Sequence, residues 1–68
     1  MISDEHRKLI HDLANSLSVL DASVSRSLTL LLKNHPELVE EITRLKKADE
    51  FSKKSISILK QFREASSN

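Results

Sequence analysis

The residues best suited to chemistry form one short polar group, His11 and Asp12 followed by Asn15, within a segment whose apolar residues have helical spacing. At about 100° of rotation per helical residue, His11 points away from the apolar stripe around it and toward solvent. A neutral, exposed imidazole is a nucleophile that can accept a phosphoryl group. Asp12 could accept a hydrogen bond from one ring nitrogen and leave the other free to react. The amide of Asn15, one turn later on the same face, could orient a water molecule or bind an oxyanion.

Two apolar stripes predict an all-α fold, an antiparallel helical hairpin that forms a single domain over residues 1–68. We expect the first helix over residues 3–33, with Ser3 as its N-cap, and the second over residues 36–64. The first stripe consists of Ile10, Leu13, Leu17, Leu20, Val24, Leu28 and Leu31. The second stripe consists of Leu38, Ile42, Leu45, Ala48, Phe51, Ile56, Leu59 and Phe62.

The predicted turn covers residues 34–36 and contains the one proline of the chain. Asn34 can end the first helix in a left-handed conformation. Pro36 suits the first turn of the second helix, because its missing N–H is not needed there. A short connection makes the two helices antiparallel neighbours, and a symmetric hairpin would place His11 opposite about Ile58.

Small size and the lack of cysteine predict an oligomer. A chain of 68 residues buries little apolar surface by itself, and without cysteine no disulfide can stabilise it. Association of two hairpins through the apolar stripes would close a four-helix bundle. We therefore expect a homodimer.

Composition also argues against several functions. The chain has no glycine, so it lacks the loops that bring backbone amides close to phosphates and should not bind ATP alone. A net charge of +1 and two phenylalanines as the only aromatic residues argue against nucleic-acid binding. No apolar run approaches the roughly 20 residues of a membrane span, and we expect a cytoplasmic protein. The spacing of His6, His11 and His35 does not predict a metal site.

The run His11-Asp12-Leu13-Ala14-Asn15-Ser16-Leu17 resembles the H-box of the HisKA-type dimerisation and histidine-phosphotransfer domain of two-component sensor histidine kinases. That family consists of helical hairpins that dimerise into four-helix bundles. By this resemblance, His11 is the phosphoacceptor, Asp12 assists proton removal and Asn15 acts in dephosphorylation of the partner response regulator. Ser16 stands where the family usually has proline, and a proline there would bend the helix.

The resemblance also implies partners. A separate ATP-binding kinase domain would supply the phosphoryl group and a receiver-domain aspartate would accept it, with ATP and Mg²⁺ on those domains and no cofactor on this chain. Small side chains near His11 would let a partner helix approach, and Lys8 could offset phosphoryl charge. The predicted partner-docking residues are Lys8, Ala14, Ser18, Ala22 and Ile58.

The leading functional hypothesis is a histidine phosphotransfer module. Whether the chain counts as an enzyme stays open, because the ATP-binding site would lie elsewhere. The alternative hypothesis is a non-catalytic helical hairpin that serves as a dimerisation module or a kinase-inhibiting interaction protein. It would use the same apolar stripes and need no reactive histidine.

Overall fold

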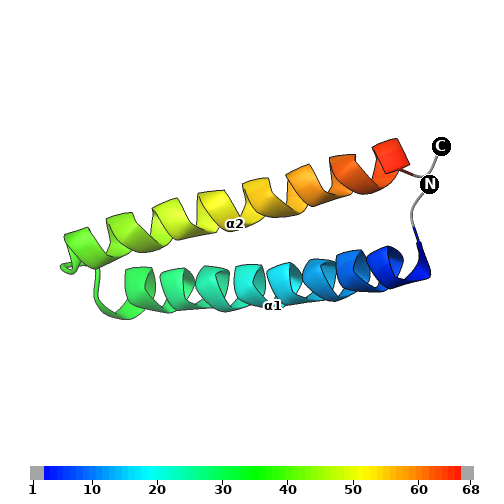
Figure 1. The fold of residues 1–68 in the computed structure, drawn as a ribbon. Helices are drawn as coiled ribbons and strands as arrows, with labels where there is room; N and C mark the ends of the chain where they lie inside the picture. Colours follow the sequence, from blue (N-terminus) through cyan, green and yellow to red (C-terminus); the bar gives the residue numbers. More distant parts are fainter. Residues whose placement is uncertain (1–2, 67–68) are drawn as a thin grey trace.

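The protein is a hairpin of two long antiparallel α-helices (Figure 1). The computed structural model describes residues 3–66, in which α1 spans Asp4–Asn34 and α2 spans Val39–Ser66. The molecule measures 50 × 16 × 13 Å, the shape of two helices lying side by side. The start of α1 and the end of α2 lie at the same end of the hairpin, opposite the turn (Figure 1). The predicted all-α hairpin is confirmed.

Helix α1 begins as the sequence predicts. Ser3 has an extended backbone, and its side-chain oxygen accepts a hydrogen bond of 3.2 Å from the backbone N–H of His6. Asp4 and Glu5 occupy the first turn, where negative charge suits the positive end of the helix dipole. The helix continues without interruption through Ser16 and ends at Asn34, one residue later than predicted.

The end of α1 differs from the predicted left-handed cap at Asn34. The cap residue is His35, with φ −141° and ψ 60°, and no residue in the range 3–66 has a positive φ. The backbone N–H of His35 donates to the carbonyl of Leu31 over 2.8 Å. This bond satisfies a free carbonyl of the last helical turn, so the chain leaves the helix without left-handed geometry.

Helix α2 begins at Val39, three residues after the predicted start at Pro36. The carbonyl of His35 accepts the N–H of Leu38 over 3.1 Å, which closes a tight turn through Pro36 and Glu37. Helical bonding starts only when the carbonyl of Leu38 accepts the N–H of Ile42 over 3.0 Å. The connection is therefore longer than predicted, because Pro36 belongs to the turn and not to the helix.

The helices pack along a line of buried and half-buried residues that we call the seam. On α1 the seam consists of Ile10, Ala14, Leu17, Asp21, Val24, Ser25, Leu28 and Leu31. On α2 it consists of Ile42, Leu45, Asp49, Ser52, Ser55, Ile56 and Leu59. Only part of each predicted stripe lies in the seam: Leu13, Leu20 and Phe51 are 50%, 51% and 57% exposed.

The middle of the seam is polar. Ser25 donates to Asp49 over 2.6 Å, and Ser52 donates to Asp21 over 2.8 Å. The ammonium of Lys53 bonds to both carboxylates and to the Ser25 hydroxyl. Ser52 and Ile42 are the two side chains of the described core that are buried, at 5% and 7% exposure. We refer to Asp21, Ser25, Asp49, Ser52 and Lys53 as the polar cluster.

The polar cluster defines which residues face each other across the hairpin. Ser25 pairs with Asp49, and four residues further from the turn Asp21 pairs with Lys53. Ten residues beyond Asp21 on α1 is His11, and ten residues beyond Lys53 on α2 is Arg63. His11 therefore lies opposite Arg63 and not, as predicted, opposite Ile58, because the longer turn moves α2 along α1.

Candidate functional site

His11 and Asn15 form an exposed pair on α1. The side-chain nitrogen Nδ2 of Asn15 lies 3.4 Å from Nε2 of His11, as expected for residues one helical turn apart. An amide NH₂ can only donate, so the contact is a hydrogen bond in the tautomer that carries the imidazole lone pair on Nε2 and the hydrogen on Nδ1. Both side chains are exposed to solvent. The nitrogen that can act as a nucleophile is therefore accessible and touches an amide donor.

Asp12 lies apart from this pair. Adjacent helical residues diverge by about 100°, and within residues 3–66 no hydrogen bond joins the Asp12 carboxylate to the imidazole of His11. The backbone carbonyl of Asp12 instead accepts the hydroxyl of Ser16 over 3.0 Å. The structure brings two of the three predicted catalytic residues together.

The predicted docking residues divide between two sides of the hairpin. Lys8, Ser18 and Ala22 are exposed on α1, and Ala14 is half-buried in the seam. At about 100° per residue, these four lie within roughly 60° of His11 around the helix axis. Ile58 is 56% exposed and lies on α2 about 140° from the middle of the seam, on the side away from His11.

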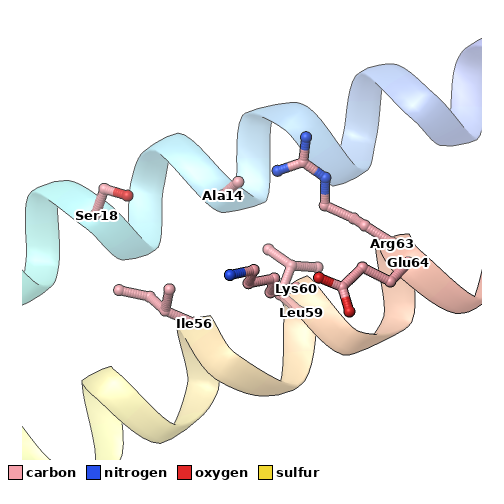
Figure 2. A pocket seen from close by; sticks show the side chains of 7 residues that line it. All are labelled: Ala14, Ser18, Ile56, Leu59, Lys60, Arg63 and Glu64. Atoms are coloured by element: carbon pink, nitrogen blue, oxygen red, sulfur yellow. The ribbon is translucent and has the colours of Figure 1, made fainter.

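A groove of about 540 Å³ separates the helices near their open end (Figure 2). Its apolar floor contains Ile56 and Leu59, and its charged residues are Lys60, Arg63 and Glu64. The α1 side consists of Ala14 and Ser18, both within two turns of His11. Two cations and one anion give this lining a net positive charge.

Sequence reasoning missed the two cations of the groove as candidate site residues. From the sequence alone, Lys60 and Arg63 are interpreted as basic residues that interact favourably with the negative C-terminal end of the helix dipole. Their place opposite the His11 segment follows from the position of the turn, which the sequence alone misplaced by three residues. The observation that reveals their place is the pairing of Asp21 with Lys53.

The described residues contain neither a cluster of metal ligands nor a helix that could span a membrane. Within residues 3–66, no group of three or more histidine, aspartate or glutamate side chains is arranged to hold a metal ion. Neither α1 nor α2, as far as the structure describes them, combines the length and the apolar character that crossing a membrane requires.

Comparisons of the chain with protein-family models, with curated proteins and with solved structures gave no match. Function is therefore inferred from the geometry of the residues themselves.

Proposed function

We propose that this protein is a histidine phosphotransfer module of two-component signalling, with His11 as the residue that carries the phosphoryl group. The observation that carries the proposal is the exposed His11–Asn15 pair on the first helix of a hairpin, with the amide of Asn15 against Nε2 of His11. A nucleophilic nitrogen and a donor suited to phosphoryl oxygens or to water thus occupy one helix face.

The chemistry consists of two transfers. In the first, the Nε2 lone pair of His11 forms a bond to the γ-phosphorus of ATP held by a kinase domain, and the bond to ADP breaks. Asp12, after a change of rotamer, accepts the Nδ1 proton. In the second, a receiver aspartate attacks the phosphorus, the P–Nε2 bond breaks with its electron pair left on Nε2, and Nδ1 takes back the proton from Asp12, so that His11 returns to the neutral form. ATP and Mg²⁺ belong to the partner domains.

A homodimer completes the proposal. Five large side chains form what we call the apolar face: Leu13, Leu20, Phe51, Ile58 and Phe62, each at least half exposed. Counted from the seam at about 100° per residue, the members on α1 and on α2 fall on the same side of the hairpin. Such a continuous exposed face favours association with a second copy into a four-helix bundle. The absence of cysteine suits the reducing cytoplasm, where we place the protein.

Chemical phosphorylation tests the assignment without knowledge of the partner kinase. Phosphoramidate donates its phosphoryl group to histidine: the new P–N bond forms at the imidazole and ammonia leaves. The labelled protein is then mixed with Mg²⁺ and receiver domains from the same organism. We expect transfer to at least one receiver, with loss of the label from His11.

Matched variants identify the residue responsible. His11→Gln should abolish transfer, whereas His6→Gln and His35→Gln, which remove the other two histidines, should leave it unchanged. Transfer that survives His11→Gln would disprove the role of His11.

The alternative, a non-catalytic interaction protein, is favoured by the apolar face alone. It requires that His11→Gln leave the biological activity intact while substitutions on the apolar face remove it.

A further inference from the structure

Arg63 lies across the hairpin from the proposed phosphoacceptor. The Ser25–Asp49 and Asp21–Lys53 pairs fix the alignment of the helices, and an equal step outward along both reaches His11 and Arg63. Arg63 belongs to α2, so nothing in the local sequence around His11 points to it. The hairpin therefore brings the cation of Arg63, which is distant in sequence, to the same position along the hairpin as His11.

The side chain of Arg63 is directed toward α1. Figure 2 shows it extending from α2 across the groove in the direction of the first helix. A residue seven positions after Ile56 lies about 20° from it around the helix, so Arg63 continues the seam. At this end of the hairpin the helices stand further apart (Figure 1), and the side chain of Arg63 extends between them (Figure 2).

The charge of Arg63 is not neutralised by a carboxylate in the described part of the chain. Lys53 bonds to Asp21 and Asp49, but within residues 3–66 Arg63 has no ion pair or hydrogen bond of its side chain. Glu64 also lines the groove, together with Lys60, and the lining keeps a net positive charge. A guanidinium that has no partner among the described residues, in a groove with an apolar floor, is available to an anion.

We propose that Arg63 binds the phosphoryl group carried by His11, and this inference rests on the proposed function. A phosphoryl group carries up to about two negative charges at neutral pH, and the planar guanidinium can bond to two of its oxygens at once. Ala14 lines the groove, and His11 lies one helical turn before Ala14 on α1. The phosphoryl group would therefore stand at the rim of the groove, between the donor amide of Asn15 and the guanidinium.

The test measures how fast phosphoramidate labels His11 relative to His35 in the same molecule. His35 lies at the turn, at the opposite end of the hairpin, and serves as an internal reference. Because an exposed charge pair contributes little, we expect Arg63→Gln to lower the His11/His35 labelling ratio about three- to fivefold. Arg63→Lys, which keeps the charge but loses the planar fork, should lower it less.

Arg44→Gln is the matched control, because it removes the same charge from an exposed position of α2 near the turn. It should leave the ratio unchanged. The difference between the wild type and Arg63→Gln should also shrink as salt screens the interaction. Circular dichroism checks that each variant keeps its helices.

Two results would overturn the inference: an unchanged ratio in Arg63→Gln, or an equal fall in Arg44→Gln. The proposed function is tested separately by transfer from His11 to a receiver. A lowered labelling ratio without any transfer would retain the role of Arg63 and reject phosphotransfer. Transfer to a receiver with an unchanged labelling ratio in Arg63→Gln would retain phosphotransfer and reject the role of Arg63.

Discussion

At the scale of single residues, His11 is the proposed nucleophile and Asn15 is the hydrogen-bond donor beside it. The 3.4 Å contact involves the same nitrogen, Nε2, that would carry the phosphoryl group. Phosphorylation must therefore displace the amide of Asn15 from the lone pair, after which its N–H groups can bond to phosphoryl oxygens or hold a water molecule. Asn15 is therefore not required for the attack of His11 on phosphorus.

Asn15→Ala should for this reason separate two activities. We expect labelling of His11 by phosphoramidate to stay within about twofold of the wild type, because the imidazole keeps its exposure. Dephosphorylation of a phosphorylated receiver should slow by roughly tenfold or more, because the amide that orients water is gone. Phosphate release measures the second activity, and His6→Ala provides an exposed control on the same helix. An equal loss of both activities would contradict the assignment.

At the scale of the helices, the polar cluster determines how α1 and α2 are aligned. Apolar side chains can slide past one another with little preference, but each hydrogen bond of Ser52 and Lys53 is made at one alignment only. Lys53 sits between two carboxylates, at 3.0 Å from Asp21 and closer to Asp49. The alignment that places Arg63 opposite His11 thus depends on charges near the middle of the hairpin.

The polar cluster should make stability depend on pH. The hydrogen bond from Lys53, followed by that from Ser25, lowers the pKa of Asp49 below its usual value. A lowered pKa means that the folded state binds its proton less readily than the unfolded state. The stabilisation is therefore present at neutral pH, above the unfolded pKa, and is lost as the pH falls through the folded pKa of Asp49. The bonds to Asp49 and Asp21 raise the pKa of Lys53, whose contribution is lost only when the pH rises above the usual lysine range.

Urea unfolding between neutral and acidic pH, followed by circular dichroism, measures this dependence. We expect the unfolding midpoint to fall on acidification in the wild type. Asp49→Asn should lower the midpoint at neutral pH and flatten its decline in acid. Glu41→Gln removes an exposed carboxylate from the same helix and should retain the wild-type profile. A wild-type profile in Asp49→Asn would show that the cluster does not contribute to stability.

Much of the fold could be predicted because apolar spacing and capping chemistry are local. Ser3 and the periodic leucines of α1 predict a helix, and Pro36 predicts the connection between the two helices. The polar positions of the seam could not be predicted in this way. From sequence alone, Asp21 and Ser52 resemble solvent-facing residues. They are hydrogen-bonded to each other, but they lie more than thirty positions apart in the sequence.

The candidate site shows the same contrast. His11 and Asn15 belong to one helical turn and could be found from spacing alone. The position of Arg63 depends on the turn, where the carbonyl of His35 closes a tight bend before α2 begins. No local pattern distinguishes that bend from a helix that starts at Pro36, and an error of a few residues there moves every facing pair.

At the scale of the whole molecule, the hairpin has two unlike sides. His11 points about 160–180° away from Leu13 and Leu20 around α1, so the proposed phosphoacceptor and the apolar face lie on opposite sides. Ile42 is the one apolar side chain of the described core that is buried, and a single hairpin of this size gains little from burial. Association through the apolar face would add a core and leave His11 accessible to partner domains.

Substitutions at two adjacent positions of α1 test this dimer. Leu20 is 51% exposed and belongs to the apolar face, whereas Val19 is 67% exposed and points about 100° further around the helix, away from the seam. In the proposed dimer, Leu20→Glu would bury a charge without a partner, and we expect monomers with reduced helix content. Val19→Glu adds the same charge in solvent and should remain dimeric. Analytical ultracentrifugation measures the mass, and a wild-type chain that sediments as a monomer at all concentrations would contradict the dimer.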